Sequence, residues 1–238
     1  MNNTNNDNVK YTNYTTYQQS EKNTYNSQNR NCLNIGDTAP TFLANTTFGE
    51  CNLLDYRGRW LVFFSHPSDF TPTCTTEFIS FSKYHSEFKK RNCELLGLSV
   101  DNITSHLAWV CDIYKTTGIQ IPFPIIEDKD CKISKMYNML DKSGETTSRS
   151  VYIICPEGII KAIINYPKTT GRNIGEILRL VEALQESEIN KVSTPANWIP
   201  GTPTISPAPK TQEEMMQKME KNNEYDCLDW YLCFNKPV

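Results

Sequence analysis

The sequence predicts an α/β protein in which helices flank a mixed central sheet, with an extended arm toward the C-terminal end. Three observations predict it. A continuous apolar run that stops before a His-Pro pair has the form of a buried strand. Apolar stripes at helical spacing alternate with further strand-like runs, and two of those runs are separated by a Pro-Glu-Gly turn. Strands that alternate with helices, together with one hairpin, are typical of a layered α/β domain with a mixed sheet.

The apolar run at residues 60–65 reads Trp-Leu-Val-Phe-Phe-Ser. A short run without polar alternation fits a strand that is buried on both faces, as in a sheet with helices on each side. Phe78, Phe81, His85 and Phe88 follow at spacings of three, four and three residues. This spacing predicts an amphipathic helix with one apolar stripe.

The remaining elements of the domain continue the alternation. We expect a strand at residues 93–100 and a helix at about 103–116. Two further strands are expected at 150–155 and 159–166, on either side of the Pro-Glu-Gly turn. A last helix is marked by apolar residues at helical spacing: Ile174, Ile177, Leu178, Val181 and Leu184.

Composition divides the chain into three parts. Residues 1–30 are rich in Asn, Thr and Tyr. Such a tail buries too little apolar surface to offset its ordering entropy, so we expect it to be disordered. Residues 31–190 carry the alternating elements and form the predicted domain. Residues 191–238 form the arm, in which five prolines between residues 195 and 209 exclude regular helix or central strand and one short helix is expected at 211–222.

Charge and hydropathy exclude several classes of function. The 238 residues include 24 Lys and Arg against 27 Asp and Glu, a net charge of −3. This balance gives no electrostatic reason to expect a nucleic-acid or anionic-membrane partner. No run approaches the roughly 20 apolar residues of a spanning helix, and the polar N-terminal residues do not resemble a secretory signal. We therefore expect a cytoplasmic protein.

Nine cysteines call for an explanation. An odd number at irregular spacing is a poor disulfide framework, and a cytosolic setting keeps most thiols reduced. A scattered cysteine is most simply interpreted as a small buried hydrophobe. That interpretation applies to Cys51, Cys93, Cys111, Cys131 and Cys155, with Cys32 incidental at the end of the polar tail, and it fits Cys74, Cys227 and Cys233 less well.

The segment at residues 65–77 joins the buried strand to the amphipathic helix, where binding sites of open α/β sheets collect. It places Cys74 in the first turn of the helix. Unpaired backbone N–H groups and the positive end of the helix dipole favour a thiolate there. Because only the thiolate of cysteine is a competent nucleophile, the sequence predicts a reactive thiol at this position.

Residues near Cys74 in the sequence are suited to assist a reactive thiol. Thr71 lies three residues before Cys74, so its hydroxyl is expected within reach of the sulfur and of a substrate oxygen. Pro67 and Pro72 stiffen the approach loop at positions where a helix start needs no donor. A fixed cation is still required, and Arg149, beside the apolar strand, is the candidate because a guanidinium offers several donors.

These residues carry a resemblance to a known family. Pro67, Thr71 and Cys74 match the Pro-x3-Thr-x2-Cys active-site motif of peroxiredoxins, and residues 66–77 resemble the 1-Cys-type (six-type) branch. Residues 166–179, which begin Tyr-Pro-Lys-Thr-Thr-Gly-Arg, and Val-Ser-Thr-Pro-Ala-Asn-Trp at 192–198 resemble that branch too, in the same order. The resemblance covers about residues 31–210.

The resemblance implies a thioredoxin fold and a thiol-specific peroxidase. Cys74 would attack hydrogen peroxide or an organic hydroperoxide and become a sulfenic acid. Thr71 and Arg149 would bind the peroxide, with Glu77 and Arg172 in support. The role of His66 stays open between shaping the pocket and a structural contact. No cofactor or metal ion is expected.

The tail cysteines raise a separate question. Cys227 and Cys233 are six residues apart, about 9 Å along a helix or 20 Å along a strand, whereas a disulfide needs Cα atoms within about 7 Å. A local bridge therefore requires a looped tail. Alternatively, either thiol meets Cys74 when the arm reaches a neighbouring subunit. Two cysteines without a role also remain open, whereas a zinc pair is disfavoured because no further pair of ligands has the right spacing.

The tail resembles the C-terminal Cys-x5-Cys of archaeal and some bacterial peroxiredoxins. This implies that Cys233 resolves the sulfenic acid across subunits and that Cys227 exchanges with it. The Val-Cys-Pro ending of typical two-cysteine members is absent. Thioredoxin is the expected reductant, with glutathione or a glutaredoxin as the alternative. We expect a homodimer at least and, from the resemblance, a ring of five dimers.

The sequence also bears on three other functions. A thioredoxin-type dithiol oxidoreductase needs Cys-x-x-Cys at the helix start, and Cys74 is followed by Thr-Thr-Glu, which excludes it. An oligomeric holdase chaperone stays open because assembly is invisible in a sequence. A peroxide sensor shares all the chemistry of the site and also stays open.

Overall fold

The computed structural model describes residues 32–220 and 226–235. The chain falls into two units, residues 1–32 and 33–238, and the elements described below belong to the second. The segment predicted to be disordered, 1–30, lies outside the described residues. Seven strands form the main sheet: β1 (Leu43–Thr46), β2 (Gly49–Asn52), β3 (Trp60–Ser65), β4 (Cys93–Ser99), β5 (Ile125–Glu127), β6 (Arg149–Ile154) and β7 (Ile160–Tyr166).

The sheet has the order β2-β1-β5-β4-β3-β6-β7. Its centre is parallel, since β3 pairs with β4 and β4 with β5 in the same direction. Strand β6 runs antiparallel to β3, and β7 continues from it as a hairpin partner. At the other edge β1 is antiparallel to β5 and to β2. The prediction of a mixed sheet is confirmed, and the predicted hairpin is β6–β7; β1 and β2 form a second hairpin that was not predicted.

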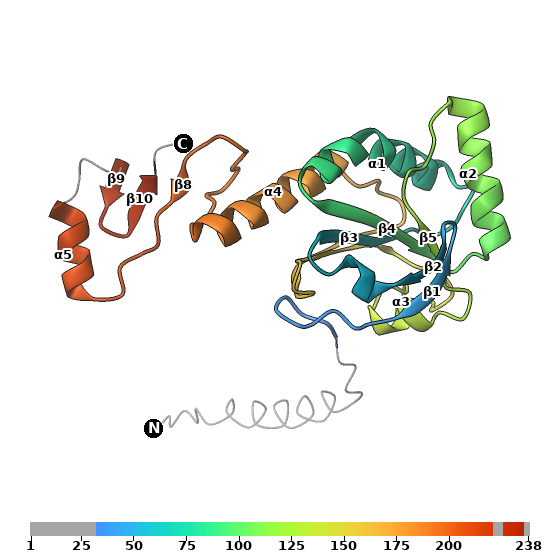
Figure 1. Ribbon diagram of the computed structural model, residues 1–238, viewed down its shortest axis with the longest axis horizontal. Helices are drawn as coiled ribbons and strands as arrows, with labels where there is room; N and C mark the ends of the chain where they lie inside the picture. The colour runs from blue at the N-terminus through green and yellow to red at the C-terminus, as the bar shows by residue number, and fades with distance from the viewer. Residues whose placement is uncertain (1–31, 221–225, 236–238) are drawn as a thin grey trace, which may run out of the picture. The chain divides into compact units, whose positions relative to one another are not determined.

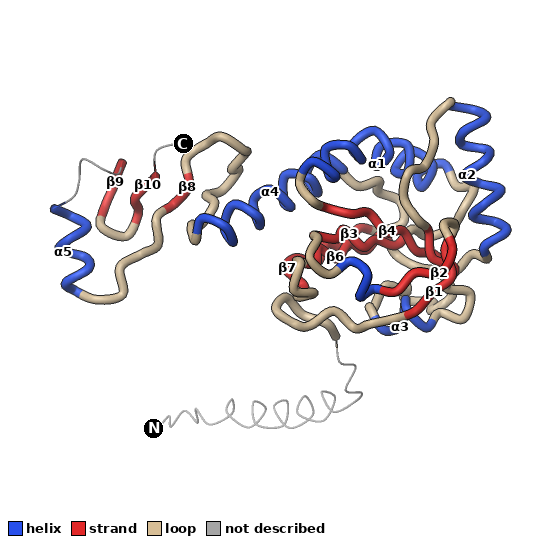
Figure 2. The backbone as a smooth tube through the Cα atoms, in the orientation of Figure 1, coloured by secondary structure: helices blue, strands red, loops and turns tan. Residues whose placement is uncertain are grey.

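Helices cover both faces of this sheet (Figures 1 and 2). Helices α1 (Pro72–Lys90), α2 (Ile103–Thr117) and α4 (Ile174–Asn190) contribute buried side chains on one face. The 3-10 turn η1 (Leu53–Tyr56) and the short helix α3 (Lys132–Met136) contribute buried side chains to the core on the opposite face. Each face therefore has its own hydrophobic core.

Strand β3 belongs to both cores, as its continuous apolar run predicts. All six of its residues are buried. Val62 and Phe64 point into the core under α1, whereas Leu61 and Phe63 point into the core on the opposite face. Successive side chains of a strand alternate between faces, so a strand enclosed by two cores needs apolar residues at every position.

The amphipathic helix predicted after β3 is α1. Phe78, Phe81 and Phe88 are buried, and the ring of Phe81 stacks on that of Phe64 with centroids 4.2 Å apart. His85 is only half-buried, so its inclusion in the apolar stripe is corrected. The stripe packs α1 against the centre of the sheet, and this packing fixes the position of the loop between β3 and α1.

The other predicted helices and strands also form, with bounds that differ by a few residues. Elements β1, β2, η1, β5 and α3 were not predicted. Each spans five residues or fewer, too short for an apolar period to show. The interpretation of the scattered cysteines holds for Cys51, Cys93 and Cys155, which are buried, but Cys131 is half-buried and Cys111 is exposed. Cys111 lies on α2 away from the face that carries His106, Trp109 and Ile113.

The C-terminal arm forms a small sheet of its own. Its elements are β8 (Thr204–Ile205), α5 (Gln212–Glu220), β9 (Asp226–Asp229) and β10 (Leu232–Asn235). The order β8-β10-β9 makes β8 an edge strand, which fits the prolines around it. Helix α5 lies where a short helix was predicted. Among the described residues, no helix is both long and apolar enough to span a bilayer.

Candidate active site

The candidate site lies at the junction of β3 and α1. A six-residue loop follows Ser65, and α1 begins at Pro72, with Thr71 as an extended N-cap residue. Phe70 has a left-handed φ of 53°, uncommon for a bulky residue, and this turn directs the chain into the helix. Cys74 is the third residue of α1 and is fully buried, at 0% exposed. The predicted place of Cys74 in the first helical turn is confirmed.

Arg149 is the cation next to Cys74. It is the first residue of β6, and its Nη1 donates to the Cys74 sulfur at 3.4 Å. The same nitrogen lies 2.6 Å from a carboxylate oxygen of Glu77, while Nε and Nη2 donate to the Lys168 carbonyl at 3.0 and 2.8 Å. Glu77 and the Lys168 carbonyl therefore hold the guanidinium, which presents a fixed positive charge to the sulfur.

Glu77 joins Arg149 to Arg172. Nε and Nη2 of Arg172 donate to the two oxygens of Glu77 at 2.9 and 2.8 Å, and its backbone N–H donates at 2.8 Å. Burial opposes ionisation of Glu77, but the two guanidinium groups outweigh it and lower the pKa of this carboxyl. A buried carboxylate between two arginines is a stable arrangement only when its oxygens are fully hydrogen-bonded, as they are here.

Arg172 also ties the network to the sheet. Its Nη1 donates to the carbonyl oxygens of Ser65 and Ser150 at 3.0 and 3.3 Å. Its guanidinium lies over the rings of Phe64 and Phe81, 5.1 and 5.5 Å from their centroids. Arg172 therefore links the end of β3, the start of β6 and the middle of α1.

Thr71 and Pro67 lie in the loop before Cys74. The hydroxyl of Thr71 donates to the Ser68 carbonyl at 2.9 Å, and its own carbonyl accepts from the N–H and hydroxyl of Thr75 at 3.0 and 2.9 Å. Pro67 is buried. Hydrogen bonds of Thr71 to Ser68 and Thr75 therefore order the end of the loop.

His66 makes a structural contact. It is fully buried, and its Nε2 lies 2.9 Å from an oxygen of Asp69. Burial lowers the pKa of His66, although the neighbouring carboxylate works against this effect. The hydroxyl of Thr147 donates to the His66 carbonyl. The imidazole and Asp69 lie at the base of the loop that leads to Thr71.

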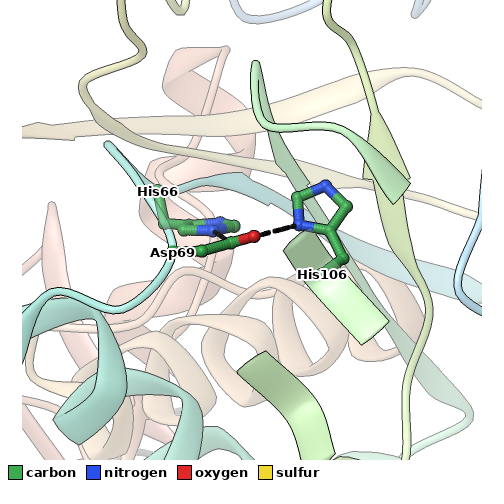
Figure 3. A group of neighbouring side chains, drawn as sticks. All are labelled: His66, Asp69 and His106. Atoms are coloured by element: carbon green, nitrogen blue, oxygen red, sulfur yellow. Dashed lines mark hydrogen bonds and ion pairs between the residues drawn. The ribbon is translucent and has the colours of Figure 1, made fainter. Parts of the chain in front are cut away.

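Three residues around this loop were missed from the sequence: Asp69, His106 and Trp109. Asp69 accepts hydrogen bonds from both imidazoles (Figure 3). His106 and Trp109 come from α2, more than thirty residues beyond the loop. The signal available was their helical spacing with Ile113, which marks the buried face of α2; it shows burial but not which loop they meet.

Within the described residues, two groups have donor atoms close enough together to hold a metal ion: His66, Asp69 and His106, and separately Cys155, Glu157 and Glu188. In the first group the imidazoles hydrogen-bond the carboxylate directly, at 2.9 and 2.8 Å. In the second, Lys161 lies 3.0 Å from Glu188 and supplies a positive charge. Hydrogen bonds hold both groups together, but His66 Nδ1 in the first and Glu188 Oε2 in the second are buried without a hydrogen-bond partner.

The structure pairs the tail cysteines with each other. A two-residue turn joins β9 to β10, so Cys227 and Cys233 lie directly opposite across the hairpin and form a disulfide. The hairpin supplies the looped tail that a local bridge requires. Cys233 is buried, and Cys227 is half-buried.

A fully buried cysteine at a helix start, in contact with a fixed arginine, defines a site for thiol-based redox chemistry. Comparison with known proteins narrows this class. Residues 35–163 match the AhpC/TSA family, and residues 183–222 match the C-terminal domain of 1-Cys peroxiredoxin. The first match covers the whole junction of β3 and α1.

Curated relatives match over most of the chain. Peroxiredoxin 2 of Caldanaerobacter subterraneus subsp. tengcongensis is 54% identical over 210 residues, covering 87% of this chain and 95% of the relative. The peroxiredoxin of Aquifex aeolicus is 46% identical, covering 85% and 96%. These organisms agree with the archaeal and bacterial branch that the tail resembles.

Solved structures agree with the sequence matches. The yeast mitochondrial 1-Cys peroxiredoxin superposes with a TM-score of 0.78 at 38% identity, covering 86% of this chain and 99% of its own. Peroxiredoxin 6 of Arenicola marina gives 0.76 at 34% identity, covering 87% and 99%. The chain therefore belongs to the peroxiredoxin family. Its fold is the thioredoxin fold with a C-terminal extension, and it is a peroxidase oxidoreductase.

Proposed function

We propose that Cys74 is the peroxidatic nucleophile, and that Arg149 and Thr71 bind the peroxide beside it. The observation that carries this proposal is the 3.4 Å contact between Arg149 Nη1 and the Cys74 sulfur, with both residues buried. A guanidinium next to sulfur stabilises the thiolate over the thiol. Pro67 supports the geometry by stiffening the loop that carries Thr71.

The reaction is a displacement at oxygen. The Cys74 thiolate attacks one peroxide oxygen, an S–O bond forms, and the O–O bond breaks. The second oxygen leaves with the bonding electron pair and takes a proton, giving water or an alcohol. Cys74 is thereby oxidised to a sulfenic acid.

Arg149 is suited to this step because its charge is already in place. Glu77 and the Lys168 carbonyl fix the guanidinium, so no reorganisation is needed when charge moves onto the leaving oxygen. Such preorganised donors stabilise a transition state more than a mobile side chain does. Glu77 and Arg172 take the supporting role, and the contact of His66 with Asp69 supports a structural one.

Resolution by the tail follows in two exchanges. Cys233 attacks the sulfenic sulfur of Cys74, which forms an inter-subunit disulfide and releases water. Cys227 then attacks Cys233, which restores the Cys74 thiolate and leaves a Cys227–Cys233 disulfide. The disulfide between these two residues is the bond the structure contains, and their facing positions in the hairpin support the exchange.

A dithiol protein of the thioredoxin type would complete the cycle. Cys227 is the more exposed sulfur of the pair, so an external thiolate would attack it and release the Cys233 thiolate; the second thiol of the reductant then frees Cys227. The yeast mitochondrial relative is described as resolved through glutathione and thioredoxin systems, which supports either reductant. The cycle would serve antioxidant defence and redox homeostasis.

Assembly and location follow from the same cycle. Peroxiredoxins are oligomeric, and we place a homodimer as the smallest unit that lets one arm reach another subunit, with a ring of five dimers as the larger assembly. We also place the enzyme in the cytoplasm, where a thiol reductant is at hand. Several buried cysteines outside any disulfide, such as Cys51, Cys93 and Cys155, support a reducing compartment.

Peroxide consumption by single-cysteine variants tests the proposal. Reduced protein is mixed with sub-stoichiometric hydrogen peroxide, and the loss of peroxide is followed in the wild type, in Cys74→Ser and in Cys111→Ser. Cys111 is an exposed thiol remote in sequence from the loop, so its variant controls for general thiol reactivity. We expect Cys74→Ser to lose fast consumption and Cys111→Ser to keep it. Equal consumption by Cys74→Ser and the wild type would refute the assignment.

A further inference from the structure

Asp69 ties the active-site loop to helix α2. The carboxylate lies five residues before Cys74 and accepts from His106 Nδ1, at 2.8 Å to one oxygen and 3.1 Å to the other. Asp69 and His106 are both buried (Figure 3). We call this contact the Asp69–His106 clamp. Neither residue belongs to the group around the sulfur formed by Arg149 and Glu77.

Each ring nitrogen of His106 faces an oxygen atom of another residue. Its Nε2 lies 3.1 Å from the Ile126 carbonyl on β5, and its Nδ1 faces Asp69. The ionised carboxylate of Asp69 can only accept, so Nδ1 supplies the proton of this contact. A hydrogen bond to a carboxylate is stronger than one between neutral groups. The hydrogen bonds from both histidines lower the pKa of Asp69 despite its burial.

A second contact from α2 reaches the first turn of α1. Trp109 Nε1 donates to the hydroxyl of Thr75 at 3.2 Å, and that hydroxyl donates to the Thr71 carbonyl at 2.9 Å. The Trp109 ring also stacks on His66 with centroids 5.1 Å apart. Helix α2 thus contacts the segment both before and after Cys74.

Closure of this segment matters because of how deeply Cys74 is buried. At 0% exposed, its sulfur cannot reach the sulfur of a second cysteine, which must come to about 2.05 Å, and this approach needs a much larger opening than the entry of hydrogen peroxide does. The first turn of α1 must therefore open after each oxidation. Any contact that ties this turn to α2 opposes the opening.

We propose that Asp69 and His106 are positioning residues that hold the active-site loop closed for the peroxide reaction and set how readily oxidised Cys74 becomes exposed. This inference rests on the proposed role of Cys74 as the peroxidatic residue. It does not depend on which thiol resolves the sulfenic acid. Loss of the clamp should speed capture of the sulfenic acid by any external reagent, while oxidation by peroxide changes little or falls.

Two substitutions at His106 separate its two hydrogen bonds. The amide of glutamine reaches the position of Nε2 and keeps a donor for the Ile126 carbonyl, so His106→Gln removes only the bond to Asp69. The amide of asparagine reaches the position of Nδ1, so His106→Asn keeps the bond to Asp69. His85→Gln, at a half-buried histidine on α1, is the matched control, and Asp69→Asn tests the clamp from its other side.

All variants are made in Cys227→Ser/Cys233→Ser protein, so that the sulfenic acid of Cys74 persists. Peroxide loss in the first turnover gives the oxidation rate. Trapping by dimedone, followed by intact-protein mass, gives the capture rate, and urea unfolding reports stability. We expect His106→Gln and Asp69→Asn to capture about tenfold faster, the size expected for one lost charged hydrogen bond, with oxidation slowed by no more than about threefold. His106→Asn and His85→Gln should stay close to the parent.

The comparison of the oxidation rate with the capture rate distinguishes a positioning role from a merely structural one. A general loss of stability would slow oxidation in proportion to the unfolded fraction and would not require Asn and Gln to differ. Unchanged capture in Asp69→Asn, or equal capture in His106→Asn and His106→Gln, would overturn the inference, and Asp69→Asn decides it if His106→Gln does not fold. A parent protein whose Cys74 forms no sulfenic acid would instead overturn the proposed function, and this inference with it.

Discussion

The guanidinium of Arg149 contacts three groups at once: the Cys74 sulfur, a Glu77 oxygen and the Lys168 carbonyl. A planar fork with five donors makes this possible, whereas the ammonium of lysine is a single point of charge. The contact with sulfur therefore depends on the shape of the side chain as well as on its charge.

Substitution of Arg149 should slow the peroxide reaction sharply. We expect Arg149→Gln to lower the second-order rate constant with hydrogen peroxide by about hundredfold or more, the usual loss when a preorganised transition-state donor is removed. Arg149→Lys should recover only part of the loss. Stopped-flow peroxide consumption measures both, with Arg59→Gln, which breaks a partly exposed ion pair with Glu94, as the control. A loss below about threefold in Arg149→Gln would contradict the role assigned to this residue.

Glu77 makes the stability of the enzyme depend on acid. Its pKa in the folded protein lies below the ordinary value of 4.5, so the unfolded chain binds the proton first as pH falls. The stabilisation is fully present above pH 4.5 and is lost as pH falls through the lower, folded-state value. The pKa of Asp69 is also lowered, so its carboxylate adds to the same dependence on acid.

Urea unfolding across a pH series tests this linkage. We expect the wild type to lose stability as the solution is acidified below pH 4.5. Glu77→Gln should be less stable near neutral pH, because two buried arginines lose their counter-charge, and should show a shallower loss in acid. An identical acid dependence in the two proteins would show that Glu77 does not carry the linkage.

At the scale of secondary-structure elements, the site depends on how α1 packs against the sheet. Phe81 stacks on Phe64, and Arg172 lies over both rings. The apolar stripe thus supports the arginine network as well as the core. Packing in this stripe should therefore affect both the stability and the chemistry.

Truncation of the stripe tests this connection. Phe81→Ala should lower the free energy of unfolding by about 3–5 kcal/mol, as for other large-to-small core substitutions. Lys83→Ala, at an exposed position on the same helix, should change it by less than about 0.5 kcal/mol. Urea denaturation gives both values. Equal stability of the two variants would mean that the stripe does not hold α1 to the sheet.

Sequence reasoning located α1 and Cys74 because both signals are local: an apolar stripe and a helix start. Arg149 could be named as a candidate from its place beside an apolar strand, but its contact with Cys74 depends on β6 pairing with β3. Asp69 and His106 were not predicted as partners, since they meet only through the packing of α2. Long-range pairing of polar side chains leaves no periodic trace in a sequence.

At the scale of the whole molecule, the tail hairpin brings the two cysteines of the arm together. Sequence spacing showed that Cys227 and Cys233 could bond only in a looped tail, and the turn between β9 and β10 supplies it. Strands β9 and β10 have four residues each, and most of β9 is exposed. An apolar alternation that would predict them is therefore missing from the sequence. Resemblance to a family motif was needed to give the pair a role.

Single serine variants of the tail separate the two proposed exchanges. After one equivalent of peroxide, Cys227→Ser should accumulate a Cys74–Cys233 disulfide between chains, seen as a dimer on a non-reducing gel. Cys233→Ser should form no such dimer, because its remaining tail thiol is the exchange partner. Peptide mass spectrometry identifies the bonded residues. A dimer in Cys233→Ser and none in Cys227→Ser would reverse the two roles, and none in either would make this a one-cysteine enzyme.

We propose that Cys74, held beside Arg149 at the start of α1, takes the oxygen from the peroxide. Non-reducing mass spectrometry of Cys227→Ser/Cys233→Ser protein, treated with one equivalent of hydrogen peroxide in the presence of dimedone, decides whether it does. We expect one adduct per chain, on the peptide that carries Cys74, and none in the same protein with Cys74→Ser. An adduct on another cysteine with Cys74 left reduced would contradict it.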